Sequence, residues 1–215
     1  MSKAFVIGGG TSLKGFDWAM LPLKGVIAVN AAVFDAPKSE YFITMDYTFF
    51  KKTRARRKFF DNLACTKFFV AGLHHPYLVE FQGTFRDKRI ARFVYDLSPV
   101  DVVLKSRRAN GCGFAWKDFR SGENSGFSGL QLAVLLGYTE IYLLGMDLTC
   151  HKGTHYHYVY PQNQLRFERK LGRYLELFHQ GLGDIKKHGG VEVFSCSEIS
   201  ALNDVIPFVP FAEVL

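Results

Sequence analysis

Short apolar runs that end in a glycine or a polar residue recur along the chain. The first three, each with the residue that follows it, are residues 3–7 before Gly8, 25–29 before Asn30 and 41–45 before Asp46. Few polar residues interrupt these runs, which is typical of parallel strands that are buried on both faces. Because open α/β sheets bind ligands beyond the carboxyl ends of their strands, we expect the chemistry of this protein at these strand ends.

The rest of the chain continues this alternation of apolar runs and helical spacing. Further strands are predicted at residues 67–71, 140–145 and 191–194, with a less distinct one within 93–104. Helices are predicted over residues 47–62, 126–136 and 164–188, the last one interrupted near residues 181–183. The pattern predicts an α/β fold that is Rossmann-like and doubly wound, with a mainly parallel sheet flanked by helices. We expect a single domain over residues 1–215, with a lid or insertion around residues 79–123.

Composition indicates a packed chain with a basic surface. Hydrophobic residues make up 48% and charged residues 22% of the 215 residues, which is too apolar for a disordered chain. The 27 Lys and Arg residues exceed the 20 Asp and Glu residues, so the formal charge is +7. Residues 51–58 carry much of this excess, either as a solvated helix face or as a surface that binds an anion such as nucleic acid.

Cysteine usage and hydropathy predict the compartment. The four cysteines are widely spaced and form no CxxC pair, so we expect reduced thiols. No apolar run approaches the roughly 20 residues that a membrane helix needs, and the first apolar run is too short for a signal peptide. These features predict a cytoplasmic protein without a transmembrane segment, and they leave a homo-oligomer open.

The stretch VIGGGTSL, residues 6–13, is the first candidate site. Backbone N–H groups of a glycine-rich turn after a strand commonly face a phosphate. The candidate nucleotide-binding residues here are Gly8, Gly9, Gly10, Thr11 and Ser12. The match to GxGxxG is incomplete because Leu13 takes the place of the third glycine, and no GK[ST] follows as in a Walker A loop. A plain tight turn therefore stays an alternative.

A second candidate site is the helix start NSGFSG, residues 124–129. Ser125 or Ser128 is expected to cap this helix. Ser125 and Gly126 also suit an anion seat at the helix N-terminus, and the two interpretations are equally open.

A third candidate site follows the strand that ends before Asp147. The segment after it is rich in histidine and tyrosine: His151, His155, Tyr156, His157, Tyr158 and Tyr160. A histidine in a cleft suits a general base, which makes His155 and His157 the catalytic candidates. A polar surface loop, a metal site of these histidines with Asp147, and a platform for stacking nucleic-acid bases are the alternatives. No HExxH spacing supports the metal site.

Together these blocks resemble the bacterial sialyltransferases of glycosyltransferase family 42. The run GGGTSLKGFDW resembles their opening GxGPSL, with Gly9 in place of an asparagine and Thr11 in place of the proline. Residues 124–148 resemble their serine-glycine helix and the strand after it, and Asn30 falls where they carry an asparagine. Their catalytic histidine is matched by no single position; the candidates are His155, His157 and His179.

The same blocks resemble the family of the archaeal 6-hydroxymethylpterin diphosphokinase, an MptE-like group. The residues that carry this second resemblance are Gly145, Asp147, Leu148, Thr154 and His155, with Phe194, Ser195, Cys196, Ser197, Ser200 and Leu202 near the end of the chain.

The first resemblance implies a glycosyltransferase that uses a nucleotide sugar of the CMP-linked type and a glycan or other hydroxyl acceptor. In this hypothesis residues 8–12 hold the nucleotide phosphate, and Asn30 and Asp46 bind the ribose or the sugar. Ser125 and Gly126 lie under the phosphate or the base. His155 or His157 takes the acceptor proton, and Tyr156, Tyr158 or Tyr160 donates to the departing phosphate, so no cofactor is required.

Two further hypotheses stay open. The second resemblance implies a Mg²⁺-dependent diphosphokinase that acts on a pterin-like alcohol, with Asp46 and Asp147 holding the Mg²⁺. The basic run at residues 51–58 is also consistent with a non-catalytic module that binds a nucleotide or nucleic acid.

Overall fold

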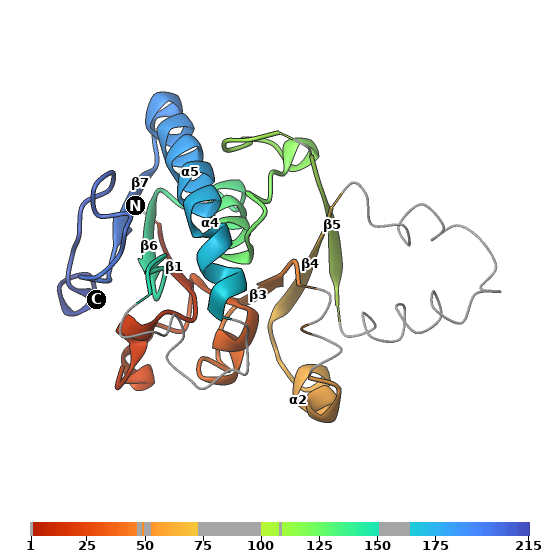
Figure 1. The fold of residues 1–215 in the computed structure, drawn as a ribbon. Coiled ribbons are helices and arrows are strands. Elements are labelled where there is room, and N and C mark those ends of the chain that lie inside the picture. Colours follow the sequence, from red (N-terminus) through yellow and green to blue (C-terminus); the bar gives the residue numbers. More distant parts are fainter. Residues whose placement is uncertain (1, 47–48, 50–52, 73–99, 108, 151–163) are drawn as a thin grey trace, which may run out of the picture.

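A computed structural model describes residues 2–46, 49, 53–72, 100–107, 109–150 and 164–215. These residues form one seven-stranded sheet with the order β5-β4-β3-β2-β1-β6-β7, in which every neighbouring pair is parallel (Figure 1). The strands are β1 (Lys3–Ile7), β2 (Val26–Val29), β3 (Tyr41–Thr44), β4 (Thr66–Gly72), β5 (Val102–Ser106), β6 (Glu140–Leu144) and β7 (Glu192–Ser195). The predicted α/β fold with a parallel sheet is confirmed.

Burial explains why the apolar runs became strands. All four residues of β2 and four of the five residues of β1 are buried, as expected for central parallel strands. In β5 buried and exposed residues alternate, since this strand lies at the edge of the sheet among the described residues. Of the residues 79–123 predicted as a lid or insertion, 100–107 and 109–123 are described and include β5, while 79–99 lie outside the described residues.

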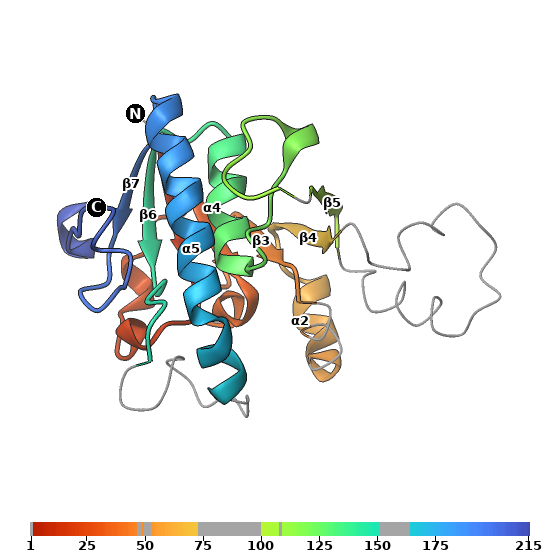
Figure 2. The ribbon, with the colours of Figure 1, turned by 45° about the horizontal axis from the view of Figure 1, so that its top comes forward.

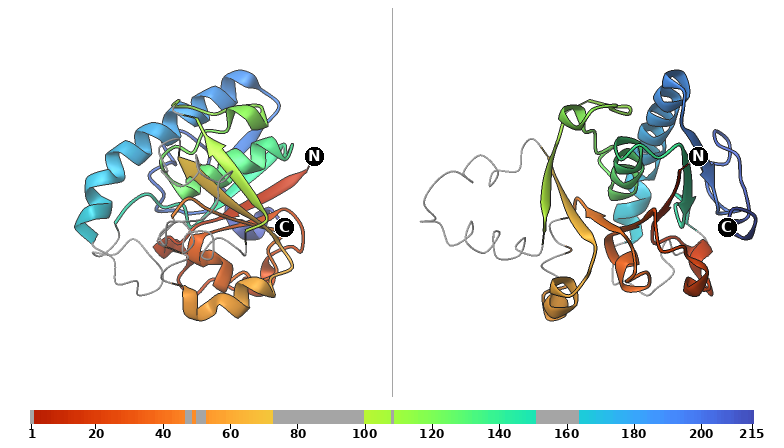
Figure 3. Two further views of the ribbon diagram at one scale, coloured as in Figure 1. Left: turned by 90° about the vertical axis from the view of Figure 1, so that its right-hand side faces the viewer. Right: turned by 180° about the vertical axis from the view of Figure 1, so that it is seen from behind.

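Two hydrophobic cores lie on the two faces of the sheet. The helices α4 (Ser125–Leu135) and α5 (Gln164–His188) cover one face (Figure 1). The other face is covered by the 3₁₀ helix η3 (Asn30–Phe34), by α2 (Arg57–Asp61) and by the C-terminal 3₁₀ helix η6 (Phe211–Glu213) (Figure 3). No helix of the described part of the chain is long and apolar enough to cross a membrane.

Helix α5 runs without a break from Gln164 to His188, so the interruption predicted near residues 181–183 is wrong (Figure 2). A Cβ atom on Gly181 would collide with the ring of Phe127 on α4. The glycine therefore allows α4 and α5 to pack closely, and this tertiary contact outweighs the poor helix propensity of glycine.

Within the predicted helix 47–62, the described residues form the short 3₁₀ helix η4 (Arg54–Arg56) followed by α2. Arg56 lies over the ring of Phe34 at 4.3 Å from its centroid, and Arg57 pairs with Asp61 at 2.8 Å. Two cations of the basic run thus have partners inside the protein, and its role in binding nucleic acid stays a prediction.

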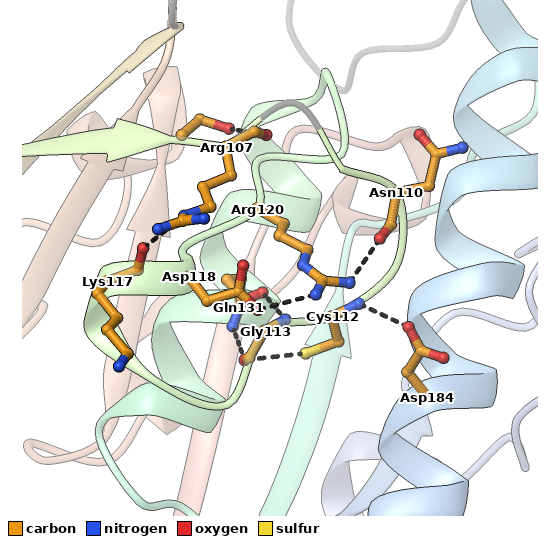
Figure 4. Close-up of polar contacts among 10 residues, drawn as sticks. Arg107, Asn110, Cys112, Gly113, Lys117, Asp118, Arg120, Gln131 and Asp184 are labelled. Carbon is orange, nitrogen blue, oxygen red and sulfur yellow. Dashed lines mark hydrogen bonds and ion pairs between the residues drawn. The ribbon is translucent and has the colours of Figure 1, made fainter.

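The segment after β5 is held against α4 by one buried side chain. Gln131 of α4 is fully buried, accepts from the Gly113 N–H at 2.7 Å and donates to the Gly113 carbonyl at 2.6 Å (Figure 4). Asp184 of α5 accepts from the Cys112 N–H at 3.1 Å. Burial, and to a smaller extent the nearby Asp184, raise the pKa of the Cys112 thiol to about 12.

The strand order places the topological switch point between β1 and β6. From β1 the chain adds β2 to β5 on one side, while β6 and β7 lie on the other. The glycine turn that follows β1 and the segment 145–147 that follows β6 therefore meet at the position where open α/β sheets bind their ligands.

Candidate functional site

The glycine turn packs directly against the end of β6. The N–H of Gly8 donates to the Leu144 carbonyl at 2.8 Å, and the N–H of Gly10 donates to the Gly145 carbonyl at 2.8 Å. These two N–H groups extend the pairing of β1 with β6 and are not directed at a ligand.

Side chains are excluded from Gly8 and Gly10 by the protein itself. A Cβ atom on Gly8 would lie 2.5 Å from the Gly145 carbonyl oxygen. A Cβ atom on Gly10 would lie 2.5 Å and 2.6 Å from the two carboxylate oxygens of Asp147. Gly9, between them, is half-buried. Glycine is therefore required at positions 8 and 10 because the residues that follow β6 occupy the space of a side chain.

Asp147 is the buried centre of this contact, with an exposed fraction of 2%. Its Oδ1 accepts hydrogen bonds from the hydroxyls of Ser12 at 2.5 Å and Ser197 at 2.8 Å. Its Oδ2 accepts from the Ser12 N–H at 2.9 Å and the Thr11 hydroxyl at 3.2 Å. A carboxylate has about four lone-pair positions, so these four donors saturate Asp147.

This donor set does not fit the Mg²⁺ role predicted for Asp147. A carboxylate binds Mg²⁺ through an oxygen lone pair, and each oxygen here already accepts two hydrogen bonds. Among the described residues no group of three or more His, Cys, Asp or Glu residues is placed to hold a metal ion. The carboxylate acts instead as a tie between the glycine turn and the segment after β7.

A hydrogen-bonded chain orients Asn30 at the end of β2. The Asp46 N–H donates to the Thr44 hydroxyl oxygen at 3.0 Å, and the Thr44 hydroxyl donates to Asn30 Oδ1 at 2.6 Å. Thr44 is fully buried, whereas Asn30 and Asp46 are half-buried. Because the amide oxygen faces Thr44, the amide NH₂ of Asn30 is the group left to face a ligand.

The start of α4 joins this edge through Ser125. Its hydroxyl oxygen accepts from the Met45 N–H at 3.1 Å, which ties the helix to the end of β3. The cap of α4 is Asn124, whose Oδ1 accepts from the Gly126 N–H at 2.6 Å and the Phe127 N–H at 3.3 Å. The expectation that Ser125 or Ser128 caps the helix is therefore wrong, and the Gly126 N–H is already engaged.

Unusual backbone conformations mark the same edge. Among the described residues, those other than glycine with a positive φ are Asn30 at 52°, Glu123 at 52° and Leu148 at 47°. Asn30 follows β2, Glu123 precedes the cap of α4, and Leu148 follows Asp147. Such conformations are costly for residues with a side chain and tend to gather at functional sites.

The predicted site residues thus divide into three groups. Gly8, Gly9, Gly10, Thr11, Ser12 and Asp147 lie in or beside the glycine turn, and Asn30, Asp46, Ser125 and Gly126 lie at the ends of β2 and β3 and at the start of α4; residues of both groups have partners within the protein. His155, His157, Tyr156 and Tyr160 lie outside the described residues, as do His151, Thr154 and Tyr158. His179 is exposed on α5. Thr44 was not predicted as a site residue; the signal for it is a hydroxyl residue that ends a buried apolar run.

Comparisons with known proteins support the fold. No protein-family model and no curated protein sequence matches the chain. A structure of the sialyltransferase CST-II in complex with a trisaccharide acceptor and CMP matches 97% of this chain and 86% of that one, with a TM-score of 0.54 and 16% identity. An asparagine-to-alanine variant of CST-II in complex with CMP matches 96% and 86%, with a TM-score of 0.55 and 17% identity. At such identities the likeness establishes a shared fold, and the resemblance to the diphosphokinases stays a prediction.

Proposed function

We propose that this protein is a glycosyltransferase that transfers a sugar from a CMP-linked donor to an acceptor hydroxyl. The fold is shared with CST-II, whose structures contain CMP and a trisaccharide acceptor. Function cannot be taken from a fold alone, so the proposal depends on the groups at the strand ends of this chain.

The orientation of Asn30 is the observation that carries the proposal. Its backbone is held at a φ of 52° and its amide oxygen is fixed by a fully buried threonine, so its NH₂ group has one direction. An oriented amide donor suits an acceptor of a nucleotide, such as a base carbonyl or a ribose oxygen. Gly9 and Asp46 follow the neighbouring strands β1 and β3, so a nucleotide bound along this edge would lie between these strand ends.

In this proposal the N-terminus of α4 lies next to the phosphate of the nucleotide and stabilises its negative charge. The N-terminus of an 11-residue helix carries a partial positive charge, and Ser125 places it at the end of β3. When the bond between the sugar and the phosphate breaks, the phosphate leaves with the electron pair and gains negative charge. The positive end of the helix dipole, held at a fixed place, stabilises this negative charge.

The acceptor hydroxyl must lose its proton as its oxygen bonds to the sugar. His155 and His157 are the proposed bases, and Tyr156 and Tyr160 the proposed donors to the leaving phosphate; both assignments follow from the sequence. A general base of this kind typically contributes about 10²–10⁴-fold to the rate.

The geometry favours this reaction over Mg²⁺-dependent diphosphate transfer. The diphosphokinase hypothesis needs Asp46 and Asp147 as ligands, and all lone pairs of Asp147 accept hydrogen bonds from the protein. If Asp147 bound Mg²⁺, it would lose hydrogen bonds from Thr11 and Ser12 that order the glycine turn, which the same hypothesis also needs.

Binding and turnover test the proposal together. Wild-type protein is titrated with CMP, UDP, GDP and ATP, each with and without Mg²⁺, and CMP is expected to bind without the metal. Turnover of a CMP-linked sugar is then expected to fall at least about 10²-fold in one of His155→Ala and His157→Ala, with CMP affinity unchanged. His188→Ala, which changes an exposed histidine at the end of α5, is the control. Binding of ATP with Mg²⁺ and no binding of CMP would overturn the proposal.

A further inference from the structure

The sequence does not reveal whether the hydroxyl groups of the glycine turn donate or accept hydrogen bonds. A carboxylate only accepts hydrogen bonds, so the hydroxyls of Thr11 and Ser12 must both donate their single proton to Asp147. Since each hydroxyl spends its proton on Asp147, lone pairs are its remaining hydrogen-bonding capacity; Ser12 is an exposed residue and Thr11 a half-buried one.

We propose that Asp147 sets the specificity of the turn by making Thr11 and Ser12 hydrogen-bond acceptors, so that the turn binds a donor group of the nucleotide and not its phosphate. The inference rests on the proposed function, since it assigns a partner to one wall of the same site. The donor groups of a CMP-linked sugar are the ribose hydroxyls and the amino group of the base, and its phosphate offers none.

The surroundings of Asp147 support this assignment. The N–H groups of Gly8, Gly10 and Ser12 donate to Leu144, Gly145 and Asp147. Three of the N–H groups that a phosphate-binding turn would use are therefore committed within the protein. The carboxylate beneath the turn also adds a negative charge, which opposes a phosphate at the same place.

The tie reaches a second segment of the chain. The hydroxyl of Ser197, a buried residue, donates to Oδ1 of Asp147 at 2.8 Å, and the nearby Ser200 donates to the Met146 carbonyl at 2.9 Å. Asp147 is thus a positioning residue: it acts on the ligand through Thr11 and Ser12, and Ser197 helps to hold it in place.

A comparison of two ligands tests the inference. Affinities of CMP and of cytidine, which lacks the phosphate, are measured by calorimetry for wild type, Ser12→Ala and Thr11→Val. If the turn binds a donor of the nucleoside, each variant weakens CMP and cytidine by the same factor of about three to ten, the range for one hydrogen bond. A loss for CMP with no loss for cytidine would place the phosphate at the turn and overturn the inference.

A matched pair of variants tests the tie. Ser197→Ala removes a donor to the carboxylate, whereas Ser200→Ala removes two hydrogen bonds of the same segment, to the Met146 carbonyl and from the Leu202 N–H, that do not involve the carboxylate. Ser197→Ala is expected to lower the affinity for both CMP and cytidine and to speed amide hydrogen exchange at residues 11–13. Ser200→Ala is expected to lower the melting temperature without either effect. Equal effects of the two variants would contradict a positioning role. If wild-type protein binds neither ligand, the proposed function fails, and the exchange rates still decide whether Asp147 orders the turn.

Discussion

Replacement of Thr44 by valine tests whether the oriented amide of Asn30 binds the nucleotide. Valine keeps the shape of threonine and removes the hydroxyl that accepts from the Asp46 N–H at 3.0 Å and donates to Asn30 Oδ1 at 2.6 Å. Loss of a partner for a buried polar group costs about 1–3 kcal/mol, and since Asn30 and Asp46 are only half-buried, we expect about 1–2 kcal/mol of unfolding free energy. For a domain of this size that corresponds to a drop in melting temperature of roughly 2–8 °C.

The effect of Thr44→Val on CMP binding is expected to be similar in free energy to its effect on stability. Without the hydroxyl the amide of Asn30 is free to rotate, and CMP affinity, measured by calorimetry, should fall about tenfold, which corresponds to about 1.4 kcal/mol. Thr44→Ser retains both hydrogen bonds and should bind CMP as wild type does. Thr53→Val is the matched control, since its buried hydroxyl donates to the Phe49 carbonyl at 2.8 Å and not to Asn30. If Thr44→Val binds CMP as tightly as Thr53→Val, the role assigned to Asn30 is wrong.

Three further predictions concern stability and reactivity. Gly10→Ala should lower the melting temperature and Gly172→Ala should not, because the new methyl group meets a carboxylate at position 10 and open space at position 172 on α5; equal losses would refute the packing role of Gly10. Gln131→Leu should cost about 2 kcal/mol or more in denaturant unfolding and speed amide exchange at Gly113, because it removes two buried hydrogen bonds to that residue. Cys112 should resist iodoacetamide at pH 8 in the folded protein and react in urea, because burial raises the pKa of its thiol to about 12 and alkylation needs the thiolate; peptide mapping by mass spectrometry measures this, and rapid labelling of the folded protein would contradict it.

The sheet could be predicted from the sequence because central parallel strands are buried on both faces. The apolar runs before Gly8, Asn30 and Asp46 needed no knowledge of their neighbours to be identified. The start of α4 was located to within one residue of its first residue, Ser125, for a similar reason: small polar residues at a helix start are a local signal.

The features that were predicted wrongly from the sequence are determined by contacts between residues far apart in the chain. The glycines at 181 and 183 read as a break in the helix, but the ring of Phe127 occupies the space that a side chain at 181 would take. The glycines at 8 and 10 read as a phosphate loop, yet β6, more than 130 residues further along, explains them. No local pattern shows that β6 is the neighbour of β1, so the role of Asp147 could not be found before the strand order was known.

The hydrogen bonds of Asp147 to the glycine turn and to Ser197 also bear on the order in which the protein folds. Ser12 and Asp147 are separated by 135 residues, and Asp147 and Ser197 by 50. A chain emerging from the ribosome presents the glycine turn first, its carboxylate much later and the serine that secures the carboxylate later still. Contacts of such long range form late in folding. The glycine turn, although it lies nearest the start of the chain, is therefore among the last parts to become ordered, and the site proposed here is incomplete in a nascent chain until β7 has joined the sheet.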